Sequence, residues 1–149
     1  MTLTVNSDAH FMKEAMKEAA QAYEKDEVPV GAVVVCDGKI IARAHNLTET
    51  LHDVTAHAEM LAITSASNFL GGKYLENCTL YVSLEPCLMC AAALNHARIS
   101  KVVWAANDPK AGFSRLEKQV LHPKTTVMQG LMADESSELL KDFFRKKRE

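Results

Sequence analysis

The sequence predicts an α/β domain in which helices cover both faces of a mixed five-stranded sheet. Segments with apolar residues at helical spacing alternate along the chain with short β-branched runs. Strands that alternate with helices favour a mixed sheet packed between helical layers. With 149 residues, the chain is expected to form one domain, residues 1–149, around one core.

The first half of the chain is expected to hold a helix, a β-hairpin and a second helix. Residues 7–26 place apolar side chains at helical spacing, with charged residues on the other face. Residues 28–46 contain two apolar runs joined by an Asp-Gly pair, which predicts the hairpin. Residues 55–69 have a helical pattern, with Thr55 as its candidate N-cap and a Gly-Gly pair after its end.

The second half continues the alternation and ends in a helix. Three short apolar runs are predicted strands: residues 78–84, 101–106 and 125–130. A helix is predicted at 86–97, with Pro86 in the favoured first position, and another at 134–148. Residues 107–124 form a loop that could hold a short helix, and a loop of this length is usually functional.

Composition excludes several classes of protein. The formal net charge is −2, so any contact with nucleic acid must use a local patch. No apolar run approaches the roughly 20 residues that a membrane-spanning helix needs, so no membrane contact is expected. Residues 1–11 lack the pattern of a secretory signal, and the four cysteines are too few for a disulfide scaffold. We therefore expect a cytoplasmic protein with reduced thiols.

Two of the cysteines suggest a metal site. Cys87 and Cys90 lie three residues apart at the start of a predicted helix, so both sulfurs share one face. Helix N-termini lower thiol pKa values and favour the thiolate that binds metal. On its own this spacing fits either a metal site or a redox pair, and two thiolates do not complete a zinc site. The other two cysteines, Cys36 and Cys78, occupy apolar strand positions and are expected to be small buried residues.

His57 is the best candidate for a third ligand. It also lies at a predicted helix start, and helix starts that follow strands can meet at one edge of a sheet. Glu59 follows two residues later, a spacing that on an ideal helix points the two side chains to nearly opposite sides. Glu59 is therefore expected beside the metal as a general acid/base, with the fourth metal position left open. Glu85 could cap the next helix, pair structurally or take part in catalysis.

The segments "HAE" at 57–59 and "PCLMC" at 86–90 resemble the H-x-E and P-C-x-x-C signature of zinc-dependent nucleoside and base deaminases. Further segments are similar to the bacterial tRNA adenosine deaminases, which convert adenosine to inosine at the wobble position: 27–35, 52–59, 80–90 and 142–148. The resemblance implies a three-layer α/β/α cytidine-deaminase-like fold. It also implies one Zn²⁺ per subunit, held by His57, Cys87 and Cys90, with Glu59 moving the protons.

The same resemblance implies the contacts to substrate. Asn46 matches a residue that contacts the target nucleoside, while Val30 and the backbone at Ala58 match residues that line the base pocket. Family members form homodimers whose RNA site uses both subunits.

The resemblance further implies contacts to the tRNA anticodon loop. Phe143, Phe144 and Arg145 in the last helix match a region that touches this loop, where both rings could stack on bases. Asp108 and Lys110 match family positions in the 107–124 segment. That segment departs from the family pattern at 113–115, where Phe-Ser-Arg replaces small residues.

Two other functions remain open at this point. A free-base or nucleoside deaminase of the same superfamily, acting on guanine, cytosine or cytidine, would carry the same zinc signature. Guanine deaminases tend to have "PFGA" where this chain has "PVGA" at 29–32. A non-catalytic zinc or RNA-binding module would have no use for Glu59.

Overall fold

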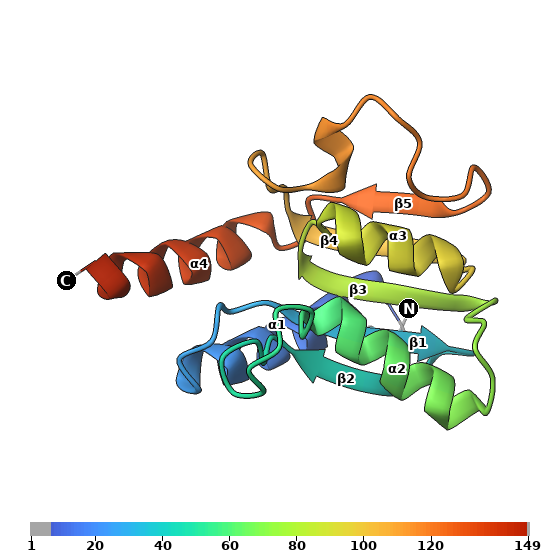
Figure 1. Cartoon of the computed structure of the whole chain (residues 1–149), viewed down its shortest axis with the longest axis horizontal. Helices are drawn as coiled ribbons and strands as arrows, with labels where there is room; N and C mark the ends of the chain where they lie inside the picture. Colours follow the sequence, from blue (N-terminus) through green and yellow to red (C-terminus); the bar gives the residue numbers. More distant parts are fainter. Residues whose placement is uncertain (1–6, 149) are drawn as a thin grey trace, which may run out of the picture.

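The computed structural model describes residues 7–148, which form three layers, α/β/α (Figure 1). Residues 1–6, part of the stretch used to judge export, lie outside this range. The strands are β1 Gly31–Cys36, β2 Lys39–His45, β3 Cys78–Leu84, β4 Lys101–Ala106 and β5 Thr126–Gln129. The helices are α1 Asp8–Glu24, α2 Ala58–Leu70, α3 Leu88–His96, the 3₁₀ turn η2 Phe113–Arg115 and α4 Ala133–Arg148. The predicted class is confirmed.

The sheet is mixed, in the order β2-β1-β3-β4-β5. β1 pairs antiparallel with both β2 and β3, while β4 is parallel to β3 and β5. Helices α2 and α3 lie on one face, and α1 lies on the other (Figure 1). Within residues 7–148, no helix is both long and apolar enough to cross a membrane.

The central strand β1 shows why the sheet is buried on both sides. Its run of small and β-branched residues does not alternate with polar ones, as expected for a strand covered on both faces. Val34 joins the apolar layer beneath α2 and α3, and its neighbour Val33 joins the layer beneath α1. Both side chains are completely buried. The sheet is therefore a rigid support for the segments that leave its edge.

Helix α1 packs against β1 at a glycine. A Cβ atom on Gly31 would lie 2.2 Å from the Ala15 carbonyl oxygen and 2.3 Å from the Ala19 nitrogen. Both are backbone atoms of α1, so no side-chain rotation could make room. Gly31 also donates its N–H to the Ser83 hydroxyl at 3.0 Å, which ties β1 to β3. A side chain at this position would push the helix away from the sheet.

Two helix starts differ from the sequence prediction. α2 begins at Ala58 with His57 as N-cap, whereas Thr55 lies in the preceding turn, where its N–H and its hydroxyl both donate to Asp53. α3 begins at Leu88 with Cys87 as N-cap, so Pro86 precedes the helix instead of opening it. The fixed φ of proline suits extended backbone as well as a first helical turn. Both N-caps consequently have extended dihedrals, which matters for the site below.

The predicted loop contains the 3₁₀ turn η2 and is packed against the sheet. The Phe113 ring meets Trp104 of β4 edge to face, with 5.5 Å between centroids. The aromatic residue that departs from the family pattern is therefore part of the loop's packing. Elsewhere, Cys78 is buried as expected, while Cys36 is only partly buried.

We predict that Gly31→Ala lowers the free energy of unfolding by about 1–3 kcal/mol, the usual cost of overpacking a core. Urea denaturation of the zinc-loaded protein measures this change. Gly72→Ala is the matched control, since a Cβ there meets nothing within 4 Å. Equal midpoints for Gly31→Ala and the wild type would show that α1 does not depend on this close contact.

Candidate active site

Three predicted metal ligands meet where α2 and α3 begin. The Nδ1 atom of His57 lies 3.7 Å from the Cys87 sulfur and 3.5 Å from the Cys90 sulfur. The three ligand atoms lie within 4.8 Å of one another. Zn–N and Zn–S bonds at tetrahedral angles place N and S about 3.6 Å apart. The cluster therefore has the dimensions and the donor set of a zinc site with three protein ligands.

The N-cap positions explain how these side chains face each other. His57 has φ −73° and ψ 153°, and Cys87 has φ −73° and ψ 174°. Neither side chain makes a capping hydrogen bond to its own helix. Cys90 comes from the first turn of α3 and is completely buried. The extended N-caps His57 and Cys87 thus bring a ring nitrogen and a sulfur close together, and Cys90 adds the second sulfur.

The charge state of the cluster also suits a cation. Hydrogen bonds from the Cys90 thiol and from His57 lower the pKa of Cys87 to about 4. The same bond to Cys87, together with burial, raises the pKa of Cys90. The bond to Cys87 raises the pKa of His57 as well, because the imidazolium faces a thiolate. A divalent metal that binds thiolate and imidazole would displace the protons that these groups share here.

Glu59 lies beside this cluster and is buried, with 4% of its surface exposed. Burial raises its pKa to about 7, partly opposed by its own backbone N–H and by the charge of His57. Its carboxylate is not one of the three atoms that converge on the metal position. Residues two apart within a helix point to nearly opposite sides. His57 and Glu59 can still lie in the same region, because His57 is an extended N-cap outside the helix. A carboxyl group of this pKa can both accept and donate a proton near neutral pH.

The three predicted substrate residues are connected by hydrogen bonds. The Asn46 side-chain oxygen accepts the N–H of Ala58 at 2.8 Å, one residue after the ligand His57. The Asn46 backbone N–H donates to the Val30 carbonyl at 3.1 Å. With its oxygen engaged, the Asn46 carboxamide presents its NH₂ group as a donor. The end of β2 and the start of α2 are therefore held in fixed relation beside the metal position.

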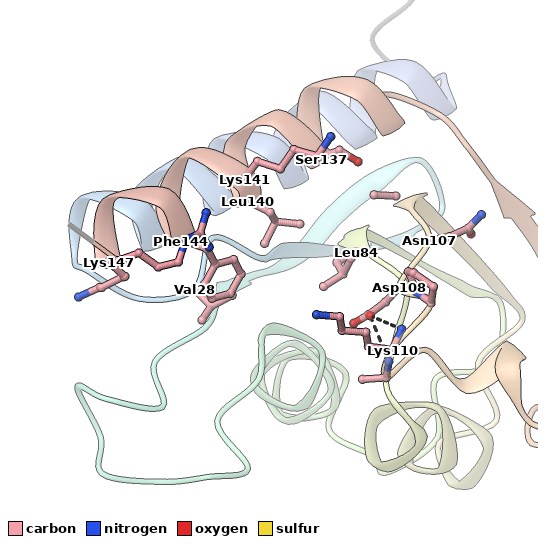
Figure 2. A pocket seen from close by; sticks show the side chains of 14 residues that line it. Val28, Leu84, Asn107, Asp108, Lys110, Ser137, Leu140, Lys141, Phe144 and Lys147 are labelled. Carbon is pink, nitrogen blue, oxygen red and sulfur yellow. Dashed lines mark hydrogen bonds between the residues drawn. The ribbon is translucent and has the colours of Figure 1, made fainter.

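A groove of about 920 Å³ lies between α4 and the segment that follows β4. Figure 2 shows Phe144 and Lys147 of α4 at one side of the groove, and Asp108 and Lys110 at the other. Its lining comprises Val28, Leu84, Ala106, Asn107, Asp108, Pro109, Lys110, Ala111, Ser137, Leu140, Lys141, Phe144, Lys147 and Arg148. Arg145 is outside this lining, and its guanidinium pairs with Asp142.

The groove contains functional candidates that the sequence did not single out. Lys141, Lys147 and Arg148 add positive charge, and their helical spacing along α4 is a signal that could have identified them. The last helix holds its place because Phe143 is buried and packs against Tyr23 of α1. The expectation that both adjacent rings are free to stack on bases was wrong for Phe143, since only Phe144 is exposed, at 44%.

A site with three zinc ligands, an open fourth position and a buried carboxyl group of raised pKa defines the class of zinc-dependent hydrolytic deaminases. A family described as the cytidine and deoxycytidylate deaminase zinc-binding region matches residues 5–106. The protein belongs to this family, which confirms the resemblance carried by "HAE" and "PCLMC".

Three known deaminases are similar to this chain. The tRNA-specific adenosine deaminase of Aquifex aeolicus (strain VF5) is 49% identical over 144 residues, covering 93% of this chain and 95% of that protein. A solved structure from a study of A-to-I editing by tRNA:A34 deaminases has a TM-score of 0.83 and 47% identity, covering 88% of this chain and 99% of that one. Guanine deaminase from Bacillus subtilis is 43% identical with a TM-score of 0.63, covering 65% of this chain and 62% of that one.

We predict that the purified protein binds one zinc ion per chain and that Cys90→Ala loses most of it, because only two ligands remain. Glu59→Ala is expected to keep its zinc, since its carboxylate is outside the ligand cluster. Atomic emission of each variant measures the metal, and circular dichroism confirms that each is folded. Loss of zinc from folded Glu59→Ala would make Glu59 a ligand.

Proposed function

We propose that the protein hydrolyses adenosine to inosine at the wobble position of tRNA, acting in the cytoplasm as a single-domain zinc deaminase. The observation that carries the chemistry is the three-ligand cluster with the buried carboxyl group of Glu59 beside it. The choice of tRNA rests on the two named relatives, both tRNA adenosine deaminases, which match nearly the whole chain. Four free cysteines are in keeping with a reducing compartment.

In this proposal Glu59 is the proton carrier. Zinc, when bound, acidifies a water molecule in the open fourth position and brings its pKa near 7. The Glu59 carboxylate accepts the proton of that water as its oxygen attacks the ring carbon bearing the amine. Glu59 then donates this proton to the ring nitrogen. It accepts the second proton from the new hydroxyl on the ring carbon as the carbonyl forms, and donates it to the amine, which leaves as ammonia. The raised pKa of Glu59 suits both directions of transfer.

Asn46, Val30 and Ala58 are proposed to hold the target nucleoside. The Asn46 NH₂ group can donate to an acceptor on the base or ribose, while its oxygen stays bound to Ala58. Val30 is buried and offers an apolar wall. Because these residues are tied to the helix start that carries His57, the nucleoside and the metal position keep a fixed relation.

The groove beside the site is proposed to bind the anticodon loop. Phe144 presents an exposed ring on which a base can stack. Lys110, Lys141 and Arg148 supply cations for phosphates, and Lys147, which pairs with Asp26, lies beside them. Asp108 lies in the same lining, and Arg145 contributes positive charge nearby. This local cationic wall overcomes the overall charge of −2.

We also infer a homodimer, as in the family. Leu51, Val54 and Leu88 are exposed apolar residues close in sequence to the ligands His57 and Cys87, with Val54 87% exposed. A second copy of the chain would cover these side chains and bring its own surface to the RNA site. Light scattering on the zinc-loaded protein tests this, since a dimer has twice the 16.4 kDa mass of one chain.

An ammonia-release assay on tRNA, guanine, cytosine and cytidine, side by side, tests the substrate. We expect turnover of tRNA with inosine in the product, and a loss of at least about 10²-fold in Glu59→Ala, the low end for removal of a general acid/base. Guanine is the competing substrate, because guanine deaminase from Bacillus subtilis is similar to 65% of this chain. Turnover of guanine with no inosine in tRNA would overturn the proposal and favour a free-base deaminase.

We predict that Phe144→Ala weakens binding of an anticodon stem-loop about tenfold, since one base-stacking contact is lost. Filter binding or fluorescence anisotropy measures this at fixed salt. Phe69→Ala is the matched control, because Phe69 is an exposed phenylalanine at the end of α2, outside the groove. If both variants bound RNA as tightly as the wild type, α4 would not be part of the RNA site.

A further inference from the structure

Glu85 is a buried carboxylate to which the proposed reaction gives no part. It lies between Leu84, which lines the groove, and Pro86, which leads into the zinc ligand Cys87, and only 3% of its surface is exposed. None of the ion pairs found within residues 7–148 involves Glu85. A buried carboxylate without a cationic partner needs hydrogen bonds to be stable.

Those hydrogen bonds all come from the segment after β4. One carboxylate oxygen accepts the backbone N–H of Asp108 at 3.0 Å. The other accepts the backbone N–H of Ser114 at 2.9 Å and its hydroxyl at 2.5 Å. Hydrogen bonds to a charged acceptor are stronger than neutral ones. Glu85 therefore binds both ends of the segment 108–114 and does not cap helix α3.

The surrounding contacts hold the same segment against the metal site. The Phe113 N–H donates to the Pro86 carbonyl at 2.9 Å, and Gly112 forms an isolated β-bridge with Cys87. A Cβ atom on Gly112 would lie 2.3 Å from the Glu85 carboxyl carbon, so the segment passes directly over this side chain.

The held segment is one wall of the groove. Residues 107–111 all line it. Inside the segment, the Asp108 side chain accepts the N–H groups of Lys110 and Ala111 at 3.1 Å each, which forms a tight turn (Figure 2). Because Glu85 holds the N–H of Asp108 itself, it sets where this turn stands and therefore where Lys110 faces the groove.

We propose that Glu85 is a positioning residue: by holding the 108–114 segment it fixes residues 108–111 as an RNA-facing wall of the groove, and so governs recognition of RNA more than chemistry at the metal. The inference rests on the proposed role of the groove as the RNA site. It also gives a role to Ser114, which donates both its N–H and its hydroxyl to this carboxylate.

A second buried glutamate, Glu27, also holds a loop by hydrogen bonds, but that loop lies outside the groove. Glu27 is completely buried and accepts the N–H groups of Glu49 and Thr50 and the hydroxyl of Thr50. It holds the 48–50 loop, none of which lines the groove. The two carboxylates use the same kind of bonding, but only Glu85 controls a groove wall.

Glutamine cannot replace Glu85. Each of its two oxygens accepts one backbone N–H, from Asp108 and from Ser114. Whichever way a glutamine amide were turned, its NH₂ group would face one of these donors. Glu85→Gln thus keeps size and shape but releases one end of the segment, whereas Ser114→Ala removes only the hydroxyl donor.

The test compares zinc-loaded wild type, Glu85→Gln and Ser114→Ala. For Glu85→Gln we expect faster hydrogen exchange at the amides of 108–114, and a KM for the anticodon stem-loop raised about tenfold, the loss of one hydrogen bond to a charged group. Turnover of a free nucleoside and zinc content are expected to stay within about twofold of the wild-type values, because the lost hydrogen bond is not to a metal ligand. Ser114→Ala is expected to show a smaller change in the same direction.

Glu14→Gln is the matched control. Glu14 is a buried, ion-paired glutamate on α1, which covers the face of the sheet opposite to α2 and α3. It is expected to alter neither exchange in 108–114 nor the KM. Unchanged exchange in Glu85→Gln would refute the hold on the segment. Faster exchange with an unchanged KM, or an equal loss on RNA and nucleoside, would refute the role in recognition. Wild type inactive on tRNA would overturn the proposed function instead, while exchange would still test the hold.

Discussion

The active site depends on one constraint, the meeting of two helix N-caps on the same face of the sheet. His57 and Cys87 are the last extended residues before α2 and α3, and the sheet beneath fixes the separation of the two helices. Because an extended N-cap does not follow helical spacing, its side chain is free to leave the helix and face its neighbour. The metal position follows from this meeting, and Glu59 stands beside it at the second position of α2.

Buried glutamates show how surroundings decide the role of one residue type. At Glu59 burial dominates and raises the pKa to about 7, which is the reason for proposing this group as the proton carrier. Burial also opposes ionisation of Glu27, but hydrogen bonds from Thr50, Glu49 and Thr48 outweigh it and lower the pKa. Glu27 therefore stays ionised and holds a loop. A protein can use the same side chain for chemistry or for support by supplying or withholding N–H donors.

Sequence patterns predicted the strands well, and the bounds of β3 and β4 agree with the predicted 78–84 and 101–106. They predicted the metal cluster too, because the cysteine pair is a local pattern and His57 occupies the corresponding place before another helix. The predicted starts of α2 and α3 were wrong, because the backbone stays extended through His57 and Cys87 before each helix begins. The groove could not be predicted, because its walls come from α4 and the segment after β4, and a pattern along the chain does not report which distant segments meet.

The stretch from Leu84 to Cys90 connects recognition to chemistry while keeping the two separable. Leu84 lines the groove, Glu85 holds the segment that forms its wall, and Cys87 and Cys90 supply two metal ligands. The ligands are fixed by α3 and the sheet, whereas the wall is attached by hydrogen bonds to Glu85 and Pro86. The wall and the metal ligands are thus held in place by different sets of contacts. This separation gives a physical reason why one zinc site serves deaminases with different substrates.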